Sequence, residues 1–98
     1  MPNDQALARL CQWYAAQCHA EWEHGMGVRI DTIDNPGWLV KINLQGTASE
    51  QNAFPEIKIS NGDTDWLHCS VKDAEFMGAG DLSKLGIILD HFLNFVMA

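Results

Sequence analysis

The sequence predicts an α+β domain of two layers. We expect one antiparallel sheet of about four to five strands, covered by helices from both chain ends, in the order α-β-β-β-β-α. Near each end, apolar residues recur at three- and four-residue steps, which is typical of amphipathic helices. Between them, short segments alternate apolar and polar residues and are bounded by turn residues, as in half-buried strands. Because 98 residues match the usual size of one domain, we predict a single domain over residues 1–98.

The first helix is predicted from about Asp4 to Cys18. Asn3 or Asp4 can cap its start, because a short side-chain oxygen accepts hydrogen bonds from the first free amides. The spacing places one set of residues on the buried face, and Trp13 lies outside it. That set is Leu7, Leu10, Cys11, Tyr14 and Cys18.

A hairpin is predicted between Thr32 and Leu44. In "WLVKINL", alternate residues from Trp38 point toward the core, and "GVRIDTI" supplies the partner strand. Pro36 sets φ for the first central position of a turn, and Gly37 supplies the positive φ that a type II turn requires next. Trp22 and Trp38 flank the hairpin and are expected to pack in the core, so these residues are interpreted as framework.

The second half of the chain predicts two more strands and a helix. "EIKIS" turns Ile57 and Ile59 inward. "WLHCSVK" turns Leu67, Cys69 and Val71 inward, which places Trp66 and His68 on the opposite face. A brief extended piece is expected at residues 75–77, and the glycines of "GAG" are interpreted as the approach to a helix. Asp81 is its predicted N-cap. The apolar stripe of this helix is Leu82, Leu85, Ile88, Leu89, Phe92, Leu93 and Val96.

The charge balance limits the kinds of partner. Thirteen acidic residues face six Lys or Arg, a net charge of −7. Nucleic acids and anionic membranes are bound by basic patches, so the composition disfavours both. It is compatible with a basic protein partner, because complementary fields accelerate association. With no apolar run long enough for a membrane span and no signal-peptide pattern, we expect a cytoplasmic protein.

Metal and disulfide sites are not indicated. Three cysteines without a secretory signal argue against a disulfide framework, and they are interpreted as small buried hydrophobes. A zinc set drawn from the histidines and cysteines lacks a Cys-x-x-Cys pair, and His68 and Cys69 point to opposite faces of one strand. We therefore predict no metal and no cofactor.

Catalysis by a Cys18 and His24 pair is the main enzymatic alternative. Glu21 and Glu23 surround this pair, and acidic neighbours raise the pKa of a thiol instead of lowering it. Paired carboxylates are interpreted as solvated surface acids, and no catalytic residue is predicted. A ligand-binding regulatory domain stays open as another alternative and would need a pocket over the outer face of the sheet.

Five blocks follow one another along nearly the whole chain: "WYAAQC" (13–18), "WEHGMGVRI" (22–30), "DNPGWLVKINLQGT" (34–47), "DWLHCSV" (65–71) and "GAGDLSKLGIILDHFL" (78–93). On these blocks together, the sequence resembles the immunity protein 53 family of bacterial polymorphic toxin systems. The chain departs from the family pattern at His19 and Ala20, where an acidic residue and a glycine are usual, and at Met26, where an aromatic is common.

The resemblance implies a protein that binds and neutralises a cognate toxin, without being an enzyme. A basic toxin is the expected partner, because the chain itself is acidic. Exposed acids steer such a partner and an exposed aromatic anchors it. The predicted contact residues are Glu21, Glu23, His24, Asp31, Asp34 and Trp66.

Overall fold

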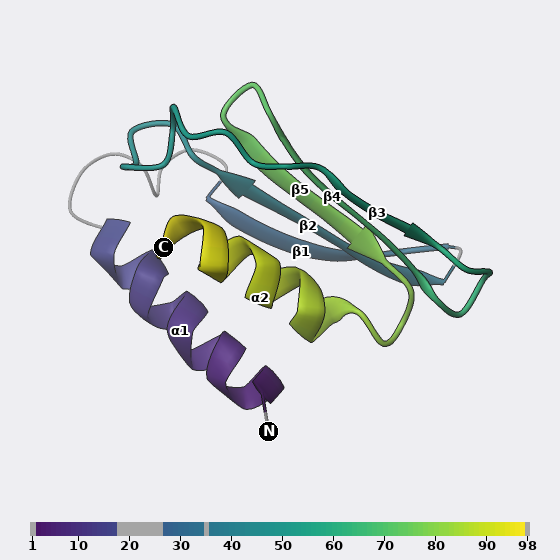
Figure 1. Ribbon diagram of the computed structural model, residues 1–98. Helices are drawn as coiled ribbons and strands as arrows, with labels where there is room; N and C mark the ends of the chain where they lie inside the picture. The colour runs from purple at the N-terminus through teal and green to yellow at the C-terminus, as the bar shows by residue number, and fades with distance from the viewer. Residues whose placement is uncertain (1, 18–26, 35, 98) are drawn as a thin grey trace.

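The computed structural model describes residues 2–17, 27–34 and 36–97 (Figure 1). Its strands form one antiparallel sheet in the order β1-β2-β5-β4-β3. The α+β prediction is confirmed, with five strands between the two helices. The elements are α1 (Pro2–Gln17), β1 (Val28–Ile33), β2 (Gly37–Asn43), β3 (Ile57–Ser60), β4 (Trp66–Lys72), β5 (Glu75–Gly80) and α2 (Leu85–Val96).

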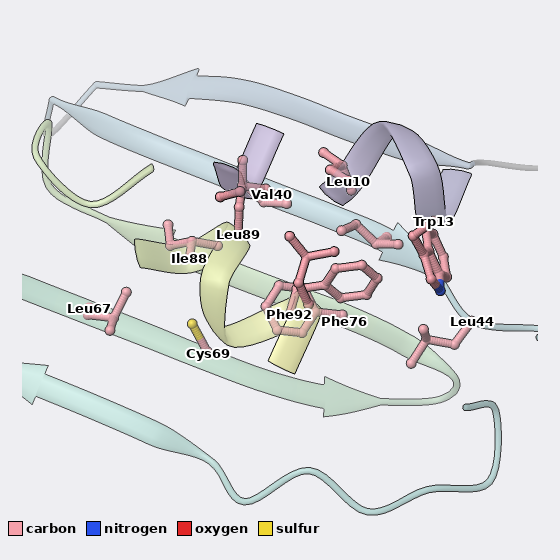
Figure 2. Packing of buried hydrophobic residues seen from close by; sticks show 13 residues of the cluster. Leu10, Trp13, Val40, Leu44, Leu67, Cys69, Phe76, Ile88, Leu89 and Phe92 are labelled. Atoms are coloured by element: carbon pink, nitrogen blue, oxygen red, sulfur yellow. The ribbon is translucent and has the colours of Figure 1, made fainter. Parts of the chain in front are cut away.

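Both helices lie on the same face of the sheet. Helix α2 packs against β5 and β4, and α1 lies beside α2 (Figure 1). Figure 2 shows the apolar residues gathered between the helices and the sheet. Of the predicted inward residues of β2 and β4, Val40, Ile42, Leu67 and Cys69 are buried there, since successive side chains on a strand alternate between its faces. Trp38 and Val71 are half-buried and pack against this core. The largest fully buried side chains include Phe76, Phe92, Ile42, Leu44, Leu67, Ile88, Leu93 and Val40. The opposite face of the sheet is not covered by α1 or α2.

The buried face of α1 differs from the predicted one. Trp13 was expected outside the core, but only 8% of it is exposed, and its ring meets Phe92 edge-on at a centroid distance of 4.9 Å. The helix is rotated about its axis so that Trp13 is buried, because the indole ring contributes more apolar area than cysteine or than tyrosine, which carries a polar hydroxyl. The buried residues are Ala6, Leu10 and Trp13. The predicted residues that are exposed instead are Leu7, Cys11 and Tyr14.

The start of α1 also differs from the prediction. The helix begins at Pro2, so Asn3 and Asp4 lie inside its first turn. Proline is suited to this place, because the amide it lacks has no partner within the helix.

The predicted hairpin is confirmed, with Ile33 paired to Gly37, but the reason given for Gly37 was wrong. Its φ does not lie in the positive range, and it is the first residue of β2. A Cβ at this position would lie 2.3 Å from the carbonyl oxygen of Gly80 on the neighbouring strand. Glycine is required here by the close approach of two backbones.

Strand β5 was predicted only as a brief piece, yet it lies at the centre of the sheet. Asp73 and Ala74 both have positive φ, 56° and 60°, and connect it to β4 as a tight hairpin. The glycines interpreted as a helix approach belong to this strand. A Cβ on Gly78 would lie 2.4 Å from Cγ2 of Ile88, so this glycine allows α2 to lie close to the sheet.

Candidate functional site

Three connections meet at one end of the sheet, which we call the turn end. Their described residues are 34 and 36 between β1 and β2, 61–65 between β3 and β4, and 81–84 between β5 and α2. The pairing of Trp38 with Gly80 and of Gly80 with Leu67 brings them to the same edge. They lie together at the right of Figure 1. Residues from distant parts of the sequence therefore share one surface.

A buried carboxylate organises this end. Asp81 Oδ2 accepts hydrogen bonds from the Trp66 amide at 2.9 Å and from Lys84 Nζ at 2.8 Å. Its Oδ1 accepts from the amide of Ser83 at 2.8 Å and from the Ser83 hydroxyl at 2.6 Å. Lys84 Nζ also lies 2.9 Å from Asp65 Oδ1. Asp81 thus connects the start of β4 to the loop before α2.

The predicted role of Asp81 as helix N-cap was wrong. Helix α2 begins at Leu85, and Lys84 occupies the cap position without a side-chain cap bond. The carboxylate of Asp81 instead bonds the loop that precedes the helix. Lys84 forms ion pairs with Asp65 and Asp81, so it is tied to the loop that precedes the helix.

All three ionisable groups of this network favour their charged forms. Hydrogen bonding from Lys84 lowers the pKa of Asp81 and of Asp65, and hydrogen bonding to Asp81 and Asp65 raises the pKa of Lys84. Only about a tenth of the Lys84 side chain is exposed, and its ammonium is paired with Asp65 and Asp81. The network therefore has a structural role.

Leu82 projects from the middle of this network. It was predicted on the apolar stripe of α2, but 63% of it is exposed, more than of any other large hydrophobic residue in the described chain. Its carbonyl accepts a hydrogen bond from Trp38 Nε1 at 3.1 Å. With Asp81 and Ser83 bonded on either side, the backbone at Leu82 is held in place while its side chain faces solvent.

Two hollows flank Leu82, each of about 420 Å³. Leu82 and Ser83 line both of them, so they adjoin. The first is also lined by Pro36, Asp63, Thr64 and Asp81. The second is also lined by Leu7, Trp38, Leu85, Gly86 and Leu89. The exposed leucine thus stands between two hollows, and more than half of the surface of each is apolar.

The turn end is acidic. Its three connections carry four carboxylates against one ammonium, a formal charge of −3, from Asp34, Asp63, Asp65, Asp81 and Lys84. The uncovered face of the sheet is more basic. It carries four of the chain's six Lys or Arg, at strand positions that alternate with inward-facing residues: Arg29, Lys41, Lys58 and Lys72. The two surfaces therefore suit partners of different charge.

The predicted contact residues fall in separate places. Asp34 is exposed at the turn end, and Trp66 is half-buried there. A Cβ on Gly37 would lie 3.3 Å from Trp66 Cζ2, so the indole ring packs over this glycine. Asp31 lies on the uncovered sheet face, 3.9 Å from the guanidinium of Arg29.

Glu21, Glu23, His24, Cys18 and Trp22 lie outside the described residues. Sequence reasoning missed two residues of the turn end. Asp63 was interpreted only as part of a turn, and Leu82 matched the helical periodicity that follows it. No local pattern distinguishes an exposed leucine before a helix from a buried one within it.

The cysteines offer little for thiol chemistry where the structure describes them. Cys69 is fully buried, and burial raises its pKa to about 11, so its reactive thiolate is scarce at neutral pH. Cys11 is exposed, which contradicts its interpretation as a buried hydrophobe. Residues 2–17, 27–34 and 36–97 bring together no group of three potential metal ligands.

A hollow of about 530 Å³ lies at the other end of the sheet. Of the described residues that line it, only Ala74 and Met77 are apolar and none is aromatic, whereas small-molecule sites are lined mainly by hydrophobic and aromatic side chains. It therefore gives the ligand-binding alternative little support. The lining residues are Asn43, Gln45, Ser70, Lys72, Asp73, Ala74, Glu75 and Met77.

Comparison with known proteins gives one match. A protein-family model described as immunity protein 53 covers residues 7–97. Searches of curated proteins and of solved structures give no significant match. Neither described helix is long and apolar enough to cross a membrane.

Proposed function

We propose that this chain, which belongs to the immunity protein 53 family, binds and neutralises a cognate bacterial toxin of a polymorphic toxin system. The family match carries the proposal. It spans residues 7–97, so it includes most of α1, all five strands and the whole of α2. A function of the family therefore concerns the whole fold.

The charged network at the turn end favours binding over catalysis. Strongly shifted pKa values often mark active sites, but structural ion pairs cause them too. Asp81 is hydrogen-bonded to Trp66, Ser83 and Lys84, and Lys84 is also paired with Asp65. These groups are committed to one another, and we interpret them as the support of a binding surface.

We further propose that the toxin is basic at its contact surface and that the complex forms in the cytoplasm. The net charge of −7 steers a basic protein toward the chain and repels nucleic acid and anionic membrane. Neutralisation requires only that the bound chain blocks the toxin, so no turnover is involved. The proposed contact residues are Glu21, Glu23, His24, Asp31, Asp34 and Trp66.

Coexpression tests this function. The toxin encoded next to the gene is induced in bacterial cells with and without the chain, and the two purified proteins are mixed on a sizing column. We expect growth to recover and a complex to elute. Unrelieved killing together with separate elution of the two proteins would overturn the proposal.

The same assay separates neutralisation by binding from catalysis. We expect Cys18→Ser and His24→Ala variants that retain their fold to protect the cells as well as the unchanged chain does. Loss of protection in a folded variant that still binds the toxin would favour the enzymatic alternative instead.

A further inference from the structure

We propose that Leu82 is the apolar anchor of a toxin-docking surface at the turn end, and that it enters an apolar socket bordered by Lys or Arg side chains on the toxin. This inference rests on the proposed function and names the contact surface. Of the contact residues predicted from sequence, this surface includes Asp34 and has Trp66 as a neighbour, and it adds Leu82 and Asp63.

The conformation of the leucine is the first argument. Its side chain is exposed, yet its backbone is fixed through the Trp38 indole and through the bonds of Asp81 to Ser83. An apolar side chain that is already held in place loses little further freedom on binding, so more of its burial contributes to affinity. Solvent exposure alone would not distinguish Leu82, but exposure on a rigid support does.

The shape of the surface is the second argument. Hollows of about 420 Å³ lie on both sides of Leu82, and they share it as a wall. A partner that covers the leucine can place its own side chains in both hollows. More than half of the surface of each hollow is apolar, so each can accept a hydrophobic side chain. The resulting interlocking of two surfaces is typical of well-packed protein interfaces.

Charge identifies the occupant. Asp34 and Asp63 are exposed at this end, and about half of the Asp65 side chain is exposed. Lys84 is the only cation of the three connections and is already paired with Asp65 and Asp81. The carboxylates of Asp34 and Asp63 therefore attract a basic partner, whereas an acidic partner is repelled.

The uncovered sheet face serves as the alternative surface and as a control. It carries Arg29, Lys41, Lys58 and Lys72, which disfavour a basic partner. Met77 is exposed on this face to 40%, so it is an apolar residue comparable to Leu82 on the wrong surface.

Leu82→Ala and Met77→Ala form the matched pair of variants. Their affinities for the toxin encoded by the neighbouring gene are measured with the full chain by titration calorimetry, and thermal unfolding confirms that both fold. We expect Leu82→Ala to weaken binding about tenfold, from the apolar area withdrawn from the interface. Met77→Ala should stay within about twofold, as is usual outside the centre of an interface.

The contribution of the carboxylates at the turn end is tested separately, with variants that remove one charge. Asp63→Asn should slow association at low salt and make it less salt-dependent, whereas Asp73→Asn, at the exposed turn on the other end of the sheet, should change the rate less. A larger effect of Asp73→Asn would argue against the turn end.

The outcomes separate the two proposals. If the unchanged chain does not bind the toxin, the proposed function and the proposed docking surface are both refuted. If it binds, and Leu82→Ala binds as tightly as Met77→Ala, only the surface falls. A loss confined to Met77→Ala would place the contact on the uncovered sheet face instead.

Discussion

Replacement of Gly37 by alanine tests why glycine occurs at the start of β2. The added Cβ would lie 2.3 Å from the Gly80 carbonyl oxygen, whereas Cβ atoms in proteins essentially never come closer than 3.0 Å to such an atom. The strands must therefore separate by about 0.7 Å, the difference of these two values. The Gly80 oxygen is a backbone atom and the Cβ is fixed rigidly to its own backbone, so no flexible side chain can move aside.

The expected cost follows from this overlap. Forcing extra atoms into a packed site costs about 1–3 kcal/mol, and a rigid backbone neighbour places Gly37→Ala near the middle or upper part of that range. Reduced freedom of the unfolded chain returns about 0.4–1 kcal/mol. We expect a net loss of about 2 kcal/mol, which lowers the melting temperature of a domain this size by about 8–16 °C.

Asparagine distinguishes this explanation from the turn-type explanation. Asparagine tolerates positive φ better than alanine does, so it would recover stability if Gly37 were needed for a left-handed conformation. If the steric contact with Gly80 is the reason, Gly37→Asn should lower stability at least as much as Gly37→Ala does. Gly46 is the control, because its φ is +80° and nothing lies within 4 Å of its Cβ position. There, Gly46→Asn should be more stable than Gly46→Ala.

Thermal and urea unfolding followed by circular dichroism measure all four variants. The reasoning is refuted if Gly37→Asn is clearly more stable than Gly37→Ala. It is also refuted if Gly37→Ala melts within a degree or two of the unchanged protein.

Three further predictions concern the core, the thiols and the ion network. Gly78→Ala should reduce the free energy of unfolding by about 1–3 kcal/mol. In a double-mutant cycle measured by urea unfolding, Gly78→Ala combined with Ile88→Ala should lose less than the sum of the two single losses, because Ile88→Ala removes the Cγ2 atom that the new Cβ would meet. Additive losses would contradict the contact. At pH 8, iodoacetamide followed by peptide mass spectrometry should modify Cys11 readily and Cys69 only after unfolding, since burial raises the Cys69 pKa to about 11; equal labelling would contradict this. Because the pKa of Asp81 is lower in the folded chain, its stabilisation is present above its unfolded pKa and is lost on acidification below about pH 4. Melting temperatures at pH 5 and pH 3 should therefore fall less for Asp81→Asn than for the unchanged protein, and equal falls would argue against this role.

Much of the fold could be predicted from local patterns. The alternation in β2 and β4 identified Val40, Ile42, Leu67 and Cys69 as inward, and all four are buried. These predictions succeed because a strand presents its side chains to alternate faces wherever it lies in a sheet. The single domain over residues 1–98 stays a prediction.

Helix α1 shows where periodicity fails. Two overlapping stripes were available, and the sequence favoured the one through Leu7 and Tyr14. The choice between them depends on what the partner helix offers. Phe92 of α2 provides an aromatic surface for Trp13, and that contact lies outside any local window.

The candidate site was the least predictable part. Trp66 and Asp81 are fifteen residues apart in sequence yet hydrogen-bonded, and Trp38 reaches the carbonyl of Leu82 across a still longer separation. The predicted contact residues were chosen by residue type, and the structure assigns Asp31 and Asp34 to different surfaces.

The sequence by itself determined the element types, the hairpin, the inward faces of the central strands and the family resemblance, because each depends on the order of neighbouring residues. The tertiary structure alone decided that β5 is central, that Gly37 makes room for Gly80, and that Leu82 is held in solvent above a buried ion network. The physical reason is that strand pairing brings distant residues within contact distance. The energies of those contacts arise only once the pairing exists.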